Sequence, residues 1–317
     1  MQSKAIGALA SLVRASVFIS LALILLAPAA YSTDHTDCAK TVAQEDFGKA
    51  FQLCEPLAEQ GDADAQTMLG AMYYVGQGVA QDFAEALKWY RLAAEQGDAG
   101  GQFNLGVMYF SGAGVSQDYP EARKWFQLAA DQGQADAQAY LGSMYANWLD
   151  EPPNFAEAVK WYRRAADQGH VGAQVYLGLM YAQGQGVAQD FAEALKWFQL
   201  AVERGDAGGQ FNLGGMYFSG AGVSQDYREA AKLYQLSADQ GWAQGQHALG
   251  LMYAEGEGLI EDYVLAYMWF DLAASQGFGP SFSYKAALAE KMTPDQIAKA
   301  EGMSANWVAD FESRQTN

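Results

Sequence analysis

Apolar and polar residues follow one another with the 3.6-residue period of α-helices through most of this 317-residue chain. Residues 63–98 show the pattern well, because they contain two apolar stripes separated by a short polar stretch. The first stripe has spacings of i, i+4, i+7 and i+8: Ala65, Leu69, Met72 and Tyr73. The second stripe contains Phe83, Ala86, Leu87, Tyr90 and Ala94. The pattern predicts two amphipathic helices joined as a hairpin.

The polar stretch between the stripes carries the signals that end one helix and start the next. Gly76-Gln77-Gly78 supplies glycine where a helix exit needs left-handed backbone, and Asp82 can cap the second helix. The alternative is a phosphate cradle, which would need a preceding strand or a following Gly-Lys-Ser/Thr. The sequence has neither, so the Gly-x-Gly stretch is predicted to be a turn.

The hairpin recurs every 36 residues, so the chain is a repeat protein. Leu-Gly, Met-Tyr and a tryptophan column return in register, with Leu233 standing for one tryptophan. The six repeats contain no insertion or deletion and span 63–98, 99–134, 135–170, 171–206, 207–242 and 243–278. One hairpin cannot bury its stripes alone, so neighbours must stack. The predicted fold is an all-α, right-handed α-solenoid of 36-residue helix-turn-helix repeats.

Two long stretches of this chain are duplicated at a distance of three repeats. Residues 76–89 and 184–197 are identical, and residues 99–106 return as 207–214. The spacing of 108 residues indicates that a block of three repeats was copied. The duplicated stretch is therefore interpreted as a structural module and not as a second active site.

The motif A-x-A-Q-x-x-L-G-x-M-Y-x-x-G-x-G-V-x-x-D-(F/Y)-x-x-A-x-x-W-(F/Y)-x-x-A-A-x-x-G over residues 46–278 resembles the Sel-one-like repeat (SLR) family, relatives of tetratricopeptide repeats. The resemblance implies a right-handed superhelix and a role as a protein-interaction adaptor, often secreted or periplasmic in bacteria. A cysteine-rich secreted branch is described as penicillin-binding or β-lactamase-like. This chain lacks that branch's cysteine pair in every repeat, which weakens the case for that activity.

The two faces of the first helices differ in how much they change from repeat to repeat. Positions 65, 66, 69, 70, 72 and 73 hardly vary, whereas positions 67, 68, 71, 74 and 75 vary and cluster on the other side. In related solenoids the first helix lines the concave side, so the variable face is the predicted binding face for an extended peptide or protein. The alternative is that these rings pack between neighbouring first helices. The predicted binding residues are Tyr74, Phe103, Asn104, Phe110, Tyr140, Tyr176, Phe211, Asn212, Phe218 and His247.

The ends of the chain are expected to cap the array. Residues 34–62 fit a shortened repeat and 279–317 a C-terminal cap, in which Thr293 to Gln296 form a capping box. The only cysteines, Cys38 and Cys54, lie eight residues on either side of the expected start of a helix at Asp46. Equal distances from a turn place them at similar heights, and an exported chain favours a disulfide. Two buried free thiols are the alternative.

The first thirty residues differ in character from the repeats. A basic start, a short apolar run and Ala27-Pro28-Ala29 predict a signal peptide over residues 1–30, with an uncleaved anchor as the alternative. Without Lys4 and Arg14, the 19 basic residues fall to 17 against 37 acidic ones. That surface disfavours nucleic acid and anionic lipid and favours a neutral or basic protein partner. The expected location is periplasmic or secreted, in a Gram-negative bacterium.

Catalytic motifs are missing from the sequence. The three histidines occupy non-equivalent positions, no His-Glu-x-x-His, Gly-x-Ser-x-Gly or Cys-x-x-Cys occurs, and no serine has lysine three residues later. Neither a metal site nor a cofactor is predicted. In the third repeat, Trp148 and Pro152-Pro153 replace the glycine turn, as a local contact site or as ordinary drift. The predicted function is a non-catalytic adaptor; the alternatives are an envelope hydrolase and an adaptor of the eukaryotic endoplasmic reticulum lumen.

Overall fold

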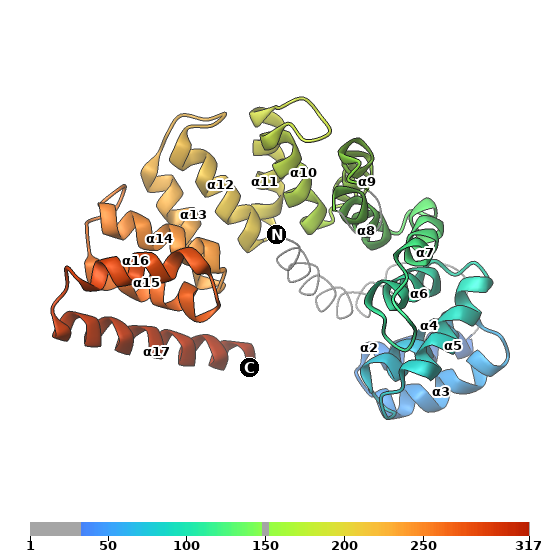
Figure 1. The fold of residues 1–317 in the computed structure, drawn as a ribbon. Helices are drawn as coiled ribbons and strands as arrows, with labels where there is room; N and C mark the ends of the chain where they lie inside the picture. Colours follow the sequence, from blue (N-terminus) through green and yellow to red (C-terminus); the bar gives the residue numbers. More distant parts are fainter. Residues whose placement is uncertain (1–32, 148–151, 317) are drawn as a thin grey trace. The chain divides into compact units, whose positions relative to one another are not determined.

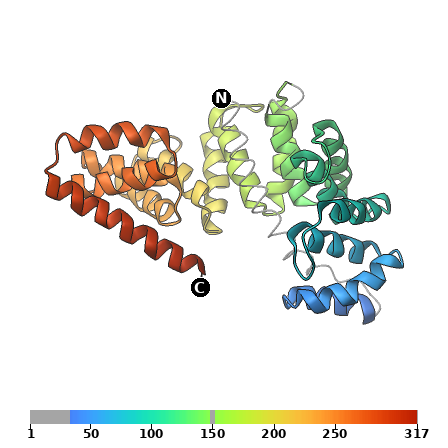
Figure 2. The same ribbon diagram turned by 60° about the horizontal axis from the view of Figure 1, so that its bottom comes forward.

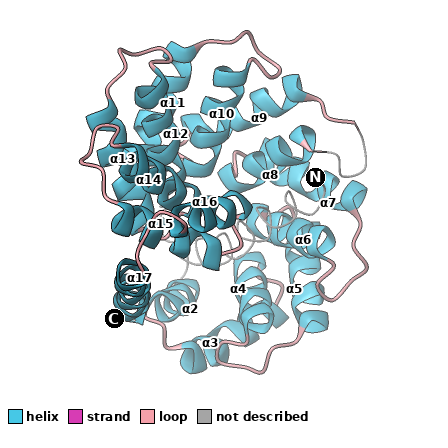
Figure 3. Ribbon diagram, turned by 60° about the vertical axis from the view of Figure 1, so that its left-hand side comes forward, coloured by secondary structure: helices cyan, strands magenta, loops and turns pink. Residues whose placement is uncertain are grey.

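The computed structural model describes residues 33–147 and 152–316 of the chain, and the regular structure of these residues is entirely helical (Figure 3). The expected signal peptide and Trp148 lie outside the described residues. Consecutive helices form pairs that follow the 36-residue repeat, which confirms the predicted all-α class (Figure 1). The right-handed superhelical course remains a prediction.

The chain divides into two compact units, residues 1–170 and 171–317, and each is described by itself. The helices of unit 1 are α2 Thr33–Ala43, α3 Phe47–Glu59, α4 Ala63–Val75, α5 Phe83–Glu95, α6 Ala99–Ser111, α7 Tyr119–Asp131, α8 Ala135–Ala146 and α9 Phe155–Asp167. Those of unit 2 are α10 Val171–Gln183, α11 Phe191–Glu203, α12 Ala207–Ser219, α13 Tyr227–Asp239, α14 Ala243–Glu255, α15 Tyr263–Ser275, α16 Gly279–Ala289 and α17 Pro294–Thr316. Figure 2 shows the helix pairs from a second side.

The glycine of each Leu-Gly pair lets the two helices of a repeat come close together. In the repeat of α8 and α9, a methyl group on Gly142 would lie 2.6 Å from the ring of Tyr162. Gly106 of α6 has the same relation to Phe126 of α7, at 2.7 Å. Because these distances are shorter than any carbon–carbon contact, only glycine permits the aromatic ring of the second helix to lie on the first.

The Gly-x-Gly stretches are turns, as predicted. Gly76 ends α4 in left-handed backbone, with φ of 80°, and its N–H donates to the carbonyl of Met72 at 2.8 Å. Gly78 approaches the preceding second helix so closely that a methyl group there would lie 2.2 Å from the carbonyl oxygen of Phe47. Asp82 then caps α5 by accepting hydrogen bonds from the N–H groups of Ala84 and Glu85. The first glycine stops a helix, and the second joins one repeat to the next.

A buried glutamine in the first helix ties three helices together. Gln138 of α8 is 4 % exposed, and its Nε2 donates to the carbonyl of Ala130 in α7 at 3.0 Å. Its Oε1 accepts a hydrogen bond from Nε2 of Gln168, which caps α9, at 2.8 Å. The carbonyl of Ala130 lies in the last turn of a helix, where intrahelical donors are lacking. The bond thus satisfies one buried group and fixes the stacking of adjacent repeats.

The N-terminal cap contains the predicted disulfide. Cys38 of α2 and Cys54 of α3 are bonded, with their Cα atoms 5.2 Å apart, and both are buried. Asp46 caps α3 by accepting from the N–H of Lys49. The cap lies on the first full repeat, because Cys38, Cys54 and Leu69 share one apolar cluster.

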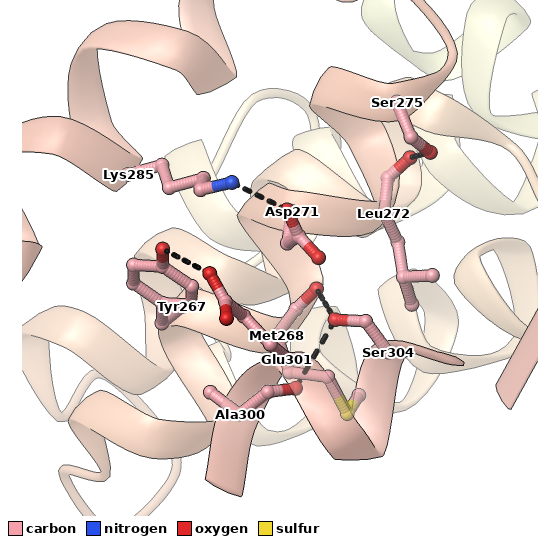
Figure 4. Close-up of polar contacts among 9 residues, drawn as sticks. All are labelled: Tyr267, Met268, Asp271, Leu272, Ser275, Lys285, Ala300, Glu301 and Ser304. Atoms are coloured by element: carbon pink, nitrogen blue, oxygen red, sulfur yellow. Dashed lines mark hydrogen bonds and ion pairs between the residues drawn. The ribbon is translucent and has the colours of Figure 1, made fainter. Parts of the chain in front are cut away.

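The last helix, α17, packs against α15, and Figure 4 shows Glu301 of α17 beside Tyr267 of α15. The predicted capping box starts it: Thr293 Oγ1 accepts from the N–H of Gln296, whose side chain accepts from the N–H of Thr293. Ser304 of α17 donates to the carbonyl of Met268 in α15 at 3.4 Å. Trp307 also meets Trp269, with ring centroids 6.1 Å apart. α17 therefore covers one side of α15, the second helix of the last repeat.

Candidate functional site

The described part of the chain contains no group of three or more His, Cys, Asp or Glu side chains that could hold a metal ion. Two histidines make polar contacts there. His170 lies 3.3 Å from Asp136, and His247 Nδ1 lies 2.9 Å from the hydroxyl of Ser281. Ser281 has no exposed surface, so its hydroxyl cannot reach a substrate, and the contact fastens α16 to α14.

The predicted binding residues separate into buried and partly exposed side chains. In unit 1, Phe103 is 2 % exposed, while Phe110 and Tyr140 are 6 % exposed each. The ring of Tyr140 stacks on Phe126 at a centroid distance of 4.9 Å and meets Phe103 at 5.6 Å. These rings belong to one core cluster of the unit.

The expectation that Phe103, Phe110 and Tyr140 face a ligand is therefore corrected. Their positions vary between repeats, but the variation does not reflect exposure to solvent. Phe103 and Phe110 of one first helix pack on Tyr140 of the next, so these three are packing residues. The rings fill the space between α6, α7 and α8, which is the alternative that the sequence left open.

In unit 2, the counterparts of Phe103 and Phe110 are Phe211 and Phe218 of α12, and both are partly exposed. They pack on Tyr234 of α13, with centroid distances of 5.8 and 6.5 Å. Phe218 also meets Tyr227 edge to face at 5.2 Å. Tyr234 itself is 6 % exposed, and burial raises the pKa of its hydroxyl to about 12. The hydroxyl is therefore protonated at neutral pH and can donate a hydrogen bond.

The other predicted binding residues are partly exposed as well. Asn212 lies next to Phe211 and donates to the carbonyl of Gly208 at 2.7 Å. Tyr176 of α10 is partly buried, and burial followed by the charge of Asp206 raises the pKa of its hydroxyl. The remaining members of this set are Tyr74, Asn104 and His247.

The partly exposed His247 lies among aromatic rings. Phe278 and Tyr284 have their ring centroids 5.1 and 5.2 Å from that of His247. Burial lowers the pKa of its imidazole, so the ring is held neutral. It packs α14 against the helix that follows the last repeat.

The second helices present a different surface. In five repeats, a lysine forms an exposed ion pair with the glutamate three residues earlier: Glu85 with Lys88, Glu121 with Lys124, Glu157 with Lys160, Glu193 with Lys196 and Glu229 with Lys232. This side of the second helices is therefore charged and in contact with water. Such pairs contribute little stability, and their charge keeps that side in water. In α15 the pair is replaced by Leu265 and Met268, and α17 packs on this helix, where Ser304 donates to the carbonyl of Met268.

Three residues next to the predicted ones were not recognised from the sequence. Tyr234 lies beneath Phe211 and Phe218, Gly215 is within 3.7 Å of the Tyr234 hydroxyl when a methyl group is placed on it, and Ala248 of α14 packs on the same cluster. The signal that could have identified them is the internal duplication, since each differs from its counterpart 108 residues earlier.

Among the described residues, no helix has the length and apolar character needed to cross a membrane.

Comparisons with known proteins agree with this architecture. The Sel1 repeat family model matches residues 39–62, 63–98, 99–134, 135–170, 171–206, 207–242 and 243–278. No curated protein matches the chain. A Sel1 repeat protein from Oxalobacter formigenes is 31 % identical, with a TM-score of 0.72 over 77 % of this chain and 97 % of its own. A protective antigen of uropathogenic Escherichia coli with an SLR fold is 30 % identical, with a TM-score of 0.56 over 85 % of this chain and 69 % of its own. The chain belongs to the Sel1 repeat family.

Proposed function

We propose that this protein is a non-catalytic adaptor that binds a protein or peptide through the variable face of its first helices. The observation that carries the proposal is the partial exposure of Phe211 and Phe218 beside the amide of Asn212 on α12. Exposed aromatic rings next to hydrogen-bonding side chains are typical of protein-binding surfaces. The second helices instead present exposed Glu–Lys pairs, which favour contact with water.

The proposed location is the periplasm or the secreted space of a bacterium. The disulfide between Cys38 and Cys54 supports an oxidising compartment, because disulfides are rare in the reducing cytosol. The excess of acidic side chains supports a neutral or basic partner, since like charges repel. The hydrolase alternative gains no support, because the serine that contacts a histidine, Ser281, is buried.

Site-specific photocrosslinking in the native compartment tests the proposal. A photoreactive amino acid at Asn212 reports on the first-helix face, and the same residue at Lys232 is the matched control, because that side chain is exposed on α13. We expect a crosslinked species of defined mass from position 212 and none from position 232. Crosslinks from position 232 alone, or from neither position in every growth condition tested, would refute the proposed binding face.

A further inference from the structure

The two copies of the duplicated block have the same first helix and turn but different neighbours. Residues 99–119 and 207–227 differ at one position in 21, where Val107 stands in the first copy and Gly215 in the second. Each copy lies within one compact unit, so the two can be compared residue by residue. The comparison shows which side chain lies on the shared rings in the first copy and which side chain replaces it in the second.

In the first copy, an aromatic ring of the next repeat completes the cluster. Tyr140 of α8 contacts three rings, with centroid distances of 4.9 Å to Phe126, 5.6 Å to Phe103 and 5.8 Å to Phe110. Val107 lies in the same cluster and is 4 % exposed. All of these side chains are buried, so the ring of Tyr140 closes the cluster against water.

In the second copy, four substitutions coincide at the same place. Alanine, Ala248, occupies the position of Tyr140, and Gly215 occupies that of Val107. Tyr234 replaces Phe126 and adds a hydroxyl, which lies 3.7 Å from a methyl group placed on Gly215. Leu251, which replaces Ser143, packs against the same cluster from α14 and is partly exposed. Ala248 and Gly215 thus remove side chains from the cluster, Tyr234 places a polar group at its base, and Leu251 adds an apolar side chain.

The rings of the second copy keep their arrangement although the closing ring is gone. Phe211 lies 5.8 Å from Tyr234, and Phe103 lies 5.8 Å from Phe126, with interplanar angles of 35° and 42°. The same holds for Phe218, whose distance to Tyr234 is 6.5 Å against 6.3 Å for its counterpart. Phe211 and Phe218 are partly exposed, whereas their counterparts Phe103 and Phe110 are buried. The site is therefore preformed, which lowers the entropic cost of filling it.

We propose that Phe211, Gly215, Phe218, Tyr234 and Ala248 form an open aromatic site that receives the ring of a tyrosine or phenylalanine from a partner protein. The occupant is inferred from Tyr140, because that ring fills the equivalent position of the same three-helix arrangement in the first copy. The hydroxyl of Tyr234, which is protonated at neutral pH, adds a donor that favours a tyrosine hydroxyl or a backbone carbonyl of the partner. This inference rests on the proposed adaptor function and specifies the chemistry of its ligand.

The experiment uses p-cresol, the side-chain analogue of tyrosine, as the probe on the full-length protein. Titration followed by NMR should shift the aromatic resonances of Phe211, Phe218 and Tyr234, with a dissociation constant on the order of 1 mM for so small a ligand. Ala248→Tyr should place a ring where Tyr140 lies in the first copy. We expect this variant to weaken p-cresol binding at least about tenfold and to raise the unfolding temperature, because a buried ring adds apolar contacts.

Ala287→Tyr is the control, since Ala287 is exposed on α16 and a ring there leaves the open site unchanged. It should bind p-cresol like the unmodified protein. The inference is overturned if p-cresol does not shift the three rings, if Ala248→Tyr binds as well as the control, or if Ala248→Tyr lowers the unfolding temperature, which would mean that the space is already filled.

The outcome is independent of the crosslinking test of the adaptor function. Binding of p-cresol without crosslinks from position 212 would leave the aromatic site standing and remove the proposed function. Crosslinks without p-cresol binding would leave the adaptor function standing and remove the aromatic site. Where both hold, Ala248→Tyr should also abolish the crosslinked species, because the partner's ring and the new tyrosine compete for one position.

Discussion

Two adjacent glycines of α12, Gly214 and Gly215, allow helix propensity and packing to be measured separately. A methyl group on Gly214 would lie 2.8 Å from the ring of Tyr234 and 3.3 Å from Cβ of Leu233, whereas one on Gly215 would have its nearest neighbour at 3.7 Å. Both residues are in the interior of the same helix, so both Gly→Ala changes gain about 1 kcal/mol from helix propensity. Only Gly214→Ala has to displace a packed ring.

The expected difference follows from these contacts. Overpacking of a core by one methyl group costs about 1–3 kcal/mol. Tyr234 is 6 % exposed and Leu233 5 % exposed, so neither can move aside into solvent. Gly214→Ala is therefore expected to range from neutral to destabilising by about 2 kcal/mol, and Gly215→Ala to stabilise by up to about 1 kcal/mol. The two variants should differ by about 1–3 kcal/mol, which corresponds to roughly 2–4 °C in unfolding temperature for each kcal/mol.

Circular dichroism at the helix band during urea and thermal unfolding measures this difference. Because neighbouring repeats unfold as coupled elements, the comparison is made between two variants of one helix and not between distant repeats. If Gly214→Ala were as stable as Gly215→Ala, the ring of Tyr234 would not be held against α12. The role assigned to the Leu-Gly glycines throughout the array would then be wrong.

Further predictions concern the cap, the buried glutamines and pH. The Cys38→Ala/Cys54→Ala variant should lose about 3 kcal/mol, and the unmodified protein from its native compartment should show no alkylatable thiol by mass spectrometry without reductant; two free thiols would contradict the bridge. Gln138→Leu should lose about 1–3 kcal/mol in urea unfolding, because the carbonyl of Ala130 loses a buried donor, and an unchanged midpoint would refute the bridging role. Burial lowers the pKa of His247 in the folded protein, so the unfolded chain takes up a proton at this residue at a higher pH than the folded chain does. The stability that the neutral imidazole contributes is therefore fully present above the unfolded pKa of about 6.5. It is lost as pH falls from that value to the lower pKa of the folded state. His247→Asn should flatten that part of the pH profile of unfolding, and an unchanged slope would contradict it.

Much of the fold could be predicted because its signals are local and repeated. Asp82, Gly76 and the two apolar stripes each determine a few residues of backbone, and every repeat presents them again in the same register. The disulfide could also be predicted from the equal distances of Cys38 and Cys54 from the turn. Their positions correspond to 74 and 90 of the first repeat. Side chains at these two positions meet in another repeat too, as Phe110 and Phe126 do at a centroid distance of 6.3 Å.

The candidate site could be predicted only in part, because variation between repeats does not by itself show that a side chain is exposed to solvent. Phe103 and Tyr140 change from repeat to repeat, yet both are core residues. Their exposure depends on which side chain the neighbouring first helix supplies, and that is a contact between residues about 36 positions apart. The periodic pattern describes each helix separately and does not contain this pairwise information. The periodic pattern likewise does not specify which helix α17 packs on, and in the structure it packs on α15.

The duplicated block suggests how such contacts can be recognised. The identical letters of its two copies identify what every repeat needs for folding, namely the turn glycines, the buried glutamine and the apolar stripes. The differences carry the specific information, because they change which side chains meet at the same place in the two copies. Replacing Tyr140 by Ala248 and Val107 by Gly215 removes buried contacts, which destabilises a core unless another molecule restores them. Two such differences around the same rings, while Phe211 and Phe218 keep their geometry, are the observations that support the proposed aromatic site.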